Sequence, residues 1–220
     1  FYIARSGRPG PVLVDITKNA QFDEFDFVYE KCTAVRSYKP VPKPNPSSIE
    51  KAAELINSAK KPFIVFGQGV ILGEAEAELK ALVEKAGIPA AWTILGLSAM
   101  DTDHPLNVGM VGMHGNYGPN MLTNECDVLI AIGMRFDDRV TGNLETYAKQ
   151  AKIVHFEIDQ AEVNKNVKVD VAVLGNAKET LAQILPLLDK KEHKEWRAEF
   201  DKMYQIEYDT LIHNDIHPTK

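Results

Sequence analysis

Hydrophobic and polar positions alternate in blocks along the middle of the chain. Short apolar runs of four to six residues are separated by longer stretches in which apolar residues recur every three or four positions. The short runs predict buried strands, and the longer stretches predict amphipathic helices. We expect strands at five places, which are residues 63–66, 89–93, 128–132, 153–158 and 169–174.

Helical spacing fills the intervals between these strands. It is clearest over residues 49–56, 74–86 and 177–188, and a shorter helix is expected after Pro119. Ser47 and Glu50 have the spacing of a capping box, and Gly87 suits the position just after a helix. Because strands and helices alternate with long crossovers, we predict an α/β fold. Its sheet should be doubly wound, mostly parallel and Rossmann-like, with helices on both faces.

The pattern is different on the N-terminal side of this block. Residues 1–5 are typical of a helix end, residues 6–11 of a turn, and residues 12–16 of a strand with no earlier partner. We interpret residues 1–38 as the C-terminal tail of a preceding domain. Residues 39–48 are rich in proline, which favours an extended linker between domains. An internal loop of a single domain is the alternative.

The C-terminal side carries one more helical pattern. Aromatic and aliphatic residues recur at roughly helical spacing among charged residues, at Trp196, Phe200, Tyr204, Tyr208 and Leu211. We predict a central domain over residues 49–189 and a one-sided amphipathic helix over residues 190–220. This helix either packs on the central domain or leads into a further domain, and the pattern does not separate these two possibilities.

Composition excludes several classes of function. The net charge is −6 and there is no long basic run, which argues against nucleic-acid binding. No apolar run approaches the roughly 18 residues of a membrane helix. The two cysteines, Cys32 and Cys126, fit a reducing cytosol and predict a cytoplasmic protein, in which Cys126 is a small core residue. The six histidines have no metal-ligand spacing, so we expect no metal site.

Candidate chemistry is concentrated after the apolar run 128–132. The following residues, 133–143, contain two arginines, two aspartates, a threonine and two glycines. In open α/β sheets, ligands bind at the carboxyl ends of the strands. Guanidinium groups there suit phosphate, because they offer paired donors. A solvated turn with an internal ion pair between arginine and aspartate is the simpler alternative.

Other strand ends add weaker signals. Gly67 and Gly69 follow the first expected strand, although the next glycine is one residue too late for the dinucleotide motif. Glu157 could accept hydrogen bonds from ribose hydroxyls. Asp159 and Asn176 also precede expected helices, and for Asp159 we favour helix capping over ligand binding. His114, a single histidine in a glycine-rich loop, carries little weight on its own.

Three segments resemble a known family. They are GRPGPVLVDITK at residues 7–18, GMHG at residues 112–115, and above all RFDDRVTGN at residues 135–143. They are similar to the large, catalytic subunits of acetolactate synthases, also called acetohydroxyacid synthases. These are thiamine-diphosphate enzymes of branched-chain amino-acid biosynthesis, which leads to valine, leucine and isoleucine. The resemblance covers essentially all of the chain and implies a central FAD-binding domain with a sixth strand near residues 104–112.

The resemblance also implies which residues bind the cofactor. FAD would lie extended across the carboxyl edge of the sheet and take no net redox part in the reaction. The implied cofactor-binding residues are Arg8, Gly67, Gln68, Gly69, Thr93, Ile94, Leu95, Val111, Gly112, Met113, His114, Gly133, Met134, Arg135, Asp137, Arg139, Val140, Glu157, Ile158, Asn176 and Ala177. Relatives commonly carry aspartate at the position of Asn176. Lys18, Met113, Asp138 and Arg139 are implied to line a substrate channel.

The activity implied by the resemblance belongs to a longer enzyme. Such an enzyme condenses two pyruvates to acetolactate, or pyruvate with 2-oxobutanoate to acetohydroxybutyrate. Other domains would bind thiamine diphosphate and Mg²⁺, and a second catalytic chain and a small regulatory subunit would be partners. The sequence contains no Gly-Asp-Gly for the diphosphate site and no implied catalytic residue. We therefore predict that this chain alone is inactive.

FAD should be held weakly, because Arg8 would lack the domain that positions it, and because the resemblance implies that a partner chain closes the flavin end of the site. The alternative enzyme classes are glyoxylate carboligases and pyruvate oxidases, which share the architecture. The non-enzyme alternative is a nucleotide-binding module that holds ADP or NAD in the same groove.

Overall fold

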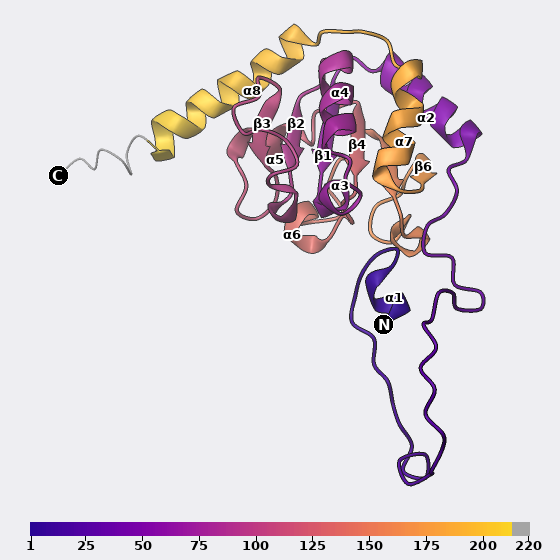
Figure 1. The fold of residues 1–220 in the computed structure, drawn as a ribbon. Helices are drawn as coiled ribbons and strands as arrows, with labels where there is room; N and C mark the ends of the chain where they lie inside the picture. Colours follow the sequence, from indigo (N-terminus) through magenta and orange to yellow (C-terminus); the bar gives the residue numbers. More distant parts are fainter. Residues whose placement is uncertain (213–220) are drawn as a thin grey trace, which may run out of the picture.

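Six parallel strands form the centre of the molecule. The structure is a computed structural model and describes residues 1–212. The strands are β1 (Pro62–Phe66), β2 (Ala90–Trp92), β3 (Asn107–Met110), β4 (Val128–Ile132), β5 (Lys152–Glu157) and β6 (Val171–Leu174). They lie in the order β3-β2-β1-β4-β5-β6, and every neighbouring pair is parallel (Figure 1). The α/β prediction is confirmed, and β3 is the sixth strand expected near residues 104–112.

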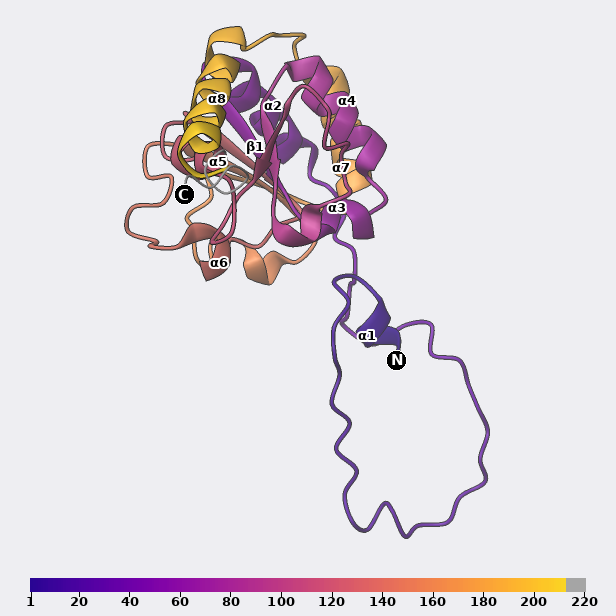
Figure 2. The ribbon, with the colours of Figure 1, turned by 90° about the vertical axis from the view of Figure 1, so that its left-hand side faces the viewer.

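Helices cover both faces of this sheet. Side chains of β1 alternate between two apolar clusters, with Ile64 in one and Phe63 in the other. The first cluster packs under α2 (Pro46–Ser58), α4 (Glu76–Ala86) and α7 (Ala177–Ile184), whose apolar residues belong to it. The second packs under α5 (Tyr117–Leu122) and α8 (Lys194–Glu207), as Figures 1 and 2 show. Every residue of β1 and β4 is buried, as expected for central parallel strands.

Helix ends partly follow the expected signals. Gly87 ends α4 in the left-handed conformation, with a φ of 61°, as predicted. The capping box at Ser47 was wrong, because the helix α2 begins earlier. Asn45 is its N-cap and accepts a hydrogen bond from the backbone N–H of Ser47, and Pro46 takes the first helical position. The single helix expected over residues 74–86 is preceded by a short separate helix, α3 (Gln68–Leu72).

The helix α8 packs on the sheet domain along its length. Trp196 and Phe200 are buried, and the indole Nε1 of Trp196 donates to the carbonyl of Pro62 at 2.8 Å. Tyr204 is exposed, but Glu207, the last residue of α8, accepts from the backbone N–H of Tyr117 at 3.1 Å. A π-helical turn follows over Tyr208–Ile212, and the structure thus supports packing on the central domain for α8. The rest of the predicted helical segment, residues 213–220, lies outside the described residues.

The N-terminal segment has almost no regular structure. After α1 (Tyr2–Arg5), residues 6–45 form no strand or helix, and in both ribbon views they extend away from the sheet domain (Figures 1 and 2). The strand expected at residues 12–16 is not formed. A strand needs a hydrogen-bonded neighbour, and within residues 1–212 this segment pairs with none, so Leu13 is 92% exposed.

Candidate functional site

A cavity opens at the carboxyl ends of the strands. The strand order reverses between β1 and β4, and in sheets of this topology the crevice at that point is where ligands bind. The cavity has a volume of about 740 Å³ and is lined by residues that follow all six strands. This volume lies in the upper part of the range for ligand pockets.

The structure brings nearly all of the predicted cofactor residues together. Those that line the cavity are Arg8, Gln68, Gly69, Thr93, Ile94, Leu95, Val111, Gly112, Met113, His114, Gly133, Met134, Arg135, Asp137, Arg139, Val140, Glu157, Ile158, Asn176 and Ala177. Their role in holding a cofactor stays a prediction. Sequence reasoning missed the other lining residues, which are Gly7, Pro9, Val41, Leu72, Gly73, Met110, Phe136, Phe156 and Gly175. Met110, Phe156 and Gly175 adjoin strand ends, and that position is the signal that could have identified them, whereas Leu72 and Gly73 stand at the end of α3 and carry no such signal.

Gly67 is the exception, since it does not line the cavity. A Cβ atom at Gly67 would lie 2.6 Å from the carbonyl oxygen of Gly133 and 2.8 Å from the Cβ of Met134. A Cβ at Gly69 would lie 2.5 Å from the Cα of Gly133. Both glycines therefore let the start of α3 approach the loop after β4, and Gly69 also lines the cavity. The backbone N–H of Gly69 donates to the carbonyl of Gly133 at 2.9 Å, which joins α3 to that loop.

The motif after β4 alternates between buried anchors and cavity-facing groups. Phe136 is buried, stacks edge-on against His155 and Tyr147, and its carbonyl accepts from Asn166 at 2.8 Å. Its φ of 51° is unusual for a residue with a side chain and is imposed by this packing. Because Phe136 points into the core, its neighbours Arg135 and Asp137 are turned to the cavity.

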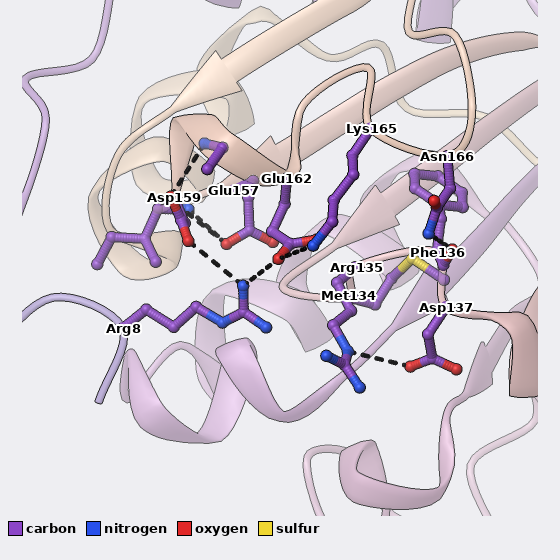
Figure 3. A network of polar contacts seen from close by, with 12 residues as sticks. Arg8, Met134, Arg135, Phe136, Asp137, Glu157, Asp159, Glu162, Lys165 and Asn166 are labelled. Atoms are coloured by element: carbon purple, nitrogen blue, oxygen red, sulfur yellow. Dashed lines mark hydrogen bonds and ion pairs between the residues drawn. The ribbon is translucent and has the colours of Figure 1, made fainter. Parts of the chain in front are cut away.

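The arginines of this motif are exposed at the cavity wall. The Nε of Arg135 lies 3.2 Å from the Oδ2 of Asp137 (Figure 3). Asp137 also caps α6 (Asp138–Thr141) by accepting from the backbone N–H of Arg139 at 3.0 Å. The internal ion pair of the simpler interpretation is present, and the same residues line the cavity. The two interpretations are therefore compatible.

A network of charges after β5 adjoins one end of the cavity, where Arg8 is its member that lines the cavity. The Nη1 of Arg8 lies 2.5 Å from the Oε1 of Glu162 and 3.3 Å from the Oδ2 of Asp159, and the Nζ of Lys165 lies 3.0 Å from the same Glu162 oxygen (Figure 3). Burial raises the pKa of Glu162, but hydrogen bonds from Arg8 and Lys165 outweigh it and hold that pKa below its usual value. Arg8 is thus held in place by residues of this chain. The expectation that Arg8 would have nothing to position it, one of the reasons for predicting weak FAD binding, is therefore wrong.

Asp159 and Asn176 both act as helix caps, as predicted. Asp159 accepts from the backbone N–H of Ala161 at 3.0 Å, at the start of the short helix η2 (Gln160–Glu162). Asn176 accepts from the backbone N–H of Lys178 at 2.9 Å, at the start of α7. Asn176 also lines the cavity, so capping does not remove it from the candidate site.

A buried histidine supports the same end of the cavity. The Nε2 of His155, on β5, lies 2.8 Å from the carbonyl oxygen of Met134 and 3.6 Å from the Oε2 of Glu157. Because the carbonyl only accepts, this nitrogen carries the proton. Glu157 is 8% exposed, and its Oε1 accepts from the backbone N–H groups of Ile158 and Asp159. Sequence reasoning missed His155, because a histidine inside an apolar strand resembles an ordinary core residue.

The opposite end of the cavity is apolar. Ile94 and Leu95, in the short helix η1 (Ile94–Gly96), and Met113 are between 60% and 68% exposed. At this end, hydrogen bonds hold the backbone of Gly112. The side-chain amide of Asn120 accepts from the N–H of Gly112 at 2.8 Å and donates to its carbonyl at 2.9 Å. Asn120 was also missed, since nothing in its sequence context marks it.

The residues implied for a substrate channel do not all meet. Met113 and Arg139 both line the cavity, and the Nη1 of Arg139 lies 3.7 Å from the sulfur of Met113. Asp138 begins α6 but is not part of the cavity lining. Lys18 belongs to the extended N-terminal segment and does not line the cavity either.

Cys126 lies in the second apolar cluster. Burial raises the pKa of the Cys126 thiol to about 12, which fits its predicted place in the core. Within residues 1–212, no group of three or more His, Cys, Asp or Glu side chains could hold a metal ion. Among the helices of the same residues, none has both the length and the apolar character needed to cross a membrane.

A family model and several known proteins match this chain over most of its length. Residues 49–184 match the family model described as thiamine pyrophosphate enzyme, central domain. A probable acetolactate synthase large subunit of Methanocaldococcus jannaschii is 43% identical over 209 residues, which cover 94% of this chain and 35% of that protein. The acetolactate synthase large subunit of Corynebacterium glutamicum is 46% identical, and the aligned part covers 84% of this chain and 30% of that protein.

A third relative covers the whole chain. The acetolactate synthase large subunit of Buchnera aphidicola subsp. Schizaphis graminum is 36% identical, and the alignment covers 100% of this chain and 40% of that protein. The chain therefore spans about a third of the length of the curated relatives it matches.

Proposed function

Because the chain belongs to the thiamine pyrophosphate enzymes, through their central domain, we propose that it is part of an acetolactate synthase large subunit and that its cavity binds FAD. The observation that carries the FAD proposal is the chemistry of the cavity lining. Acidic and basic side chains stand at one end, arginines at the middle, and exposed apolar side chains at the other end.

Each part of the lining suits one part of a flavin dinucleotide. The Oε2 of Glu157 accepts no hydrogen bond within residues 1–212 and lies 3.6 Å from the Nε2 of His155, so it can accept from ribose hydroxyls, and Asn176 lines the same cavity. Arg135 and Arg139 offer charged donors for the diphosphate. Ile94, Leu95 and Met113 offer apolar surface for the ring. ADP would leave that apolar surface uncovered, which favours FAD over ADP as the ligand.

The chemistry supplied by bound FAD is structural, since the reaction implied by the resemblance needs no net redox step. The residues of this chain hold the ligand and exclude water from it. The proposed reaction of the whole enzyme condenses two pyruvates, or pyruvate and 2-oxobutanoate, with thiamine diphosphate as the family's cofactor. Mg²⁺, a second catalytic chain and a small regulatory subunit are proposed for the whole enzyme as well, and the cytoplasm as its location.

The names of the relatives favour acetolactate synthase over glyoxylate carboligase and pyruvate oxidase. These two stay alternatives for the enzyme class, and an ADP or NAD module stays an alternative for the ligand.

A binding titration tests the proposed ligand. FAD is added to the 220-residue chain while flavin fluorescence is followed, with ADP and NAD as competitors. We expect saturable binding of FAD, displacement by ADP only at higher concentration, and little competition by NAD. Equal affinity for FAD and ADP would contradict the proposed use of the apolar end. The same preparation should form no acetolactate from pyruvate with thiamine diphosphate and Mg²⁺.

A further inference from the structure

The N-terminal segment reaches the cavity through one charged side chain. Arg8 follows α1, and its Nη1 lies 2.5 Å from the Oε1 of Glu162 and 3.3 Å from the Oδ2 of Asp159. Arg8 also lines the cavity. A single guanidinium therefore touches both the acidic residues after β5 and the proposed ligand space.

Glu162 is the more firmly fixed of the two acids. Its side chain is 6% exposed, whereas that of Asp159 is 34% exposed. A buried carboxylate needs charged or hydrogen-bonding partners, and Arg8 and Lys165 both bind its Oε1. Arg8 lines the cavity and Lys165 does not, so Arg8 is the partner of Glu162 on the cavity side. Figure 3 shows both side chains reaching the same carboxylate.

The contact leaves other donors of Arg8 available. Both hydrogen bonds of its guanidinium use Nη1, and within residues 1–212 no hydrogen bond engages its Nε or Nη2. A guanidinium held at one corner keeps its remaining N–H groups in a fixed direction. On the basis of the proposed function, we propose that Glu162 is a positioning residue that directs Arg8 at the bound cofactor, with Asp159 as the weaker partner.

This arrangement has two measurable consequences. A side chain that is already fixed loses little freedom when the ligand binds, so affinity depends on Glu162 although Glu162 is outside the cavity lining. The same contact ties residues near position 8 to the sheet domain. Loss of Glu162 should therefore weaken cofactor binding and also loosen the start of the N-terminal segment.

A double-mutant cycle tests the first consequence. FAD affinity is measured for the 220-residue chain and for the variants Glu162→Gln, Arg8→Ala and both together. We expect each single variant to lower affinity about tenfold, which is about 1.4 kcal/mol. The double variant should lose no more than either single variant, because the two residues act as one unit. Glu162→Asp should recover part of the affinity, since it keeps the charge.

Glu125→Gln is the matched control. Glu125 precedes β4, at the amino ends of the strands and so away from the cavity at their carboxyl ends. Its Oε2 lies 4.0 Å from the Nζ of Lys61, which is a loose ion pair. Its loss should leave FAD affinity unchanged. If Glu162→Gln binds FAD like the wild type while Arg8→Ala is weakened, the positioning role is wrong. Additive losses in the double variant would also overturn it.

A measurement without ligand separates this proposal from the proposed function. A spin label is attached through Gly10→Cys, in a chain with Cys32→Ser, because a side chain at position 10 has no atom within 4 Å. We expect Glu162→Gln and Arg8→Ala to increase label mobility to the same extent, and Glu125→Gln to leave it unchanged. Unchanged mobility in Glu162→Gln would overturn the proposal.

The two proposals can fail separately. If the wild type does not bind FAD, the proposed function fails, while label mobility still decides whether Glu162 holds Arg8. If circular dichroism shows that Glu162→Gln does not fold, Glu162→Asp takes its place in both measurements. Its shorter side chain should then give a smaller loss of affinity and a smaller gain of mobility, and no change in either would overturn the proposal.

Discussion

The two ends of the cavity are held in different ways. At the charged end, the side chains themselves are held: Arg8 is bound by the carboxylate of Glu162, and Glu157 accepts from backbone N–H groups. At the apolar end, Asn120 fixes the backbone of Gly112, but Ile94 and Leu95 stay more than half exposed. The charged end is therefore preorganised for a ligand, whereas the apolar end must gain its order and its burial when the ligand binds.

This difference predicts how affinity is divided over the ligand. Preorganised polar groups lose little freedom on binding, so the adenosine diphosphate part should contribute most of the affinity of FAD. Apolar side chains that stay open to water on one side contribute less, since the gain scales with the area removed from water. The four predictions below test this division, starting with the change that should disturb both ends at once.

The largest effect is expected for Gly133→Ala. Gly133 has a φ of 59°, and a Cβ atom there would lie 2.6 Å from the Cα of Gly69. Left-handed backbone costs about 1–2 kcal/mol, and an overpacked contact costs about 1–3 kcal/mol. We expect the free energy of unfolding to fall by about 3 kcal/mol and FAD and ADP binding to be lost together, as measured by urea unfolding and by titration.

Two glycines serve as controls for this prediction. Gly142 also has a positive φ, at 57°, with a ψ of −127° that is outside the left-handed helical region, and no atom lies within 4 Å of its Cβ position. Gly142→Ala therefore adds backbone strain without a close contact, and Gly10→Ala changes a glycine with neither feature. If Gly133→Ala keeps the stability of the wild type, the close approach of the start of α3 and the loop after β4 has no energetic weight.

The second effect is expected at the middle of the cavity. Arg135→Ala should lower the affinities for FAD and for ADP by the same factor, about tenfold or more, because hydrogen bonds to charged groups are worth about 1.5–3 kcal/mol. The measurement is parallel titration with both ligands. Lys152→Ala, which removes a cation at the amino end of β5, is the control. If Arg135→Ala weakens FAD but not ADP, Arg135 contacts the flavin part of the ligand, and its proposed contact with the diphosphate is wrong.

The third effect separates the two ends directly. Ile94→Ser and Leu95→Ser should weaken FAD severalfold and leave ADP unchanged, because only the ring would cover these side chains. Leu97→Ser is a matched control, since Leu97 is 51% exposed but does not line this cavity. The readout is the ratio of the two dissociation constants. A constant ratio in Ile94→Ser would mean that the ring does not reach the apolar end.

The same division explains what the sequence could predict. Periodicity located every strand of the sheet except β3, because buried strands and amphipathic helices leave patterns that depend only on local burial. The cavity residues followed from strand ends and from the resemblance. Gly67 was misplaced, because a sequence shows that glycine allows close approach but does not show which partner approaches.

Residues that act through another residue had no sequence signal. Glu162 stands three residues after Asp159, which is the spacing of a capping box, and His155 stands inside an apolar run, while Arg8 and Met134, their partners, lie far away along the chain. The absent strand at residues 12–16 has a related cause. An apolar run predicts a strand only if a neighbouring strand is present, and within residues 1–212 this run has none.

The smallest effect concerns the pH dependence of the charged end. Burial raises the pKa of Glu162, but its bonds to Arg8 and Lys165 lower it more, so the folded-state pKa lies below the ordinary value of 4.5. A lowered carboxyl pKa stabilises the folded state above the unfolded-state pKa, and this stability is lost as the pH falls through the folded-state pKa. Arg8 stays charged throughout this range, since its own pKa is raised.

The expected contribution is about 1 kcal/mol or less, because Arg8 is 36% exposed and solvent screens the pair. Urea unfolding of the wild type and of Glu162→Gln should differ most at pH 7, and the difference should shrink below pH 4.5, where protonated Glu162 resembles glutamine. High salt should reduce the difference at pH 7. A difference that disappears well above pH 4.5 would mean that burial outweighs the ion pair, and that Arg8 does not hold this end of the cavity.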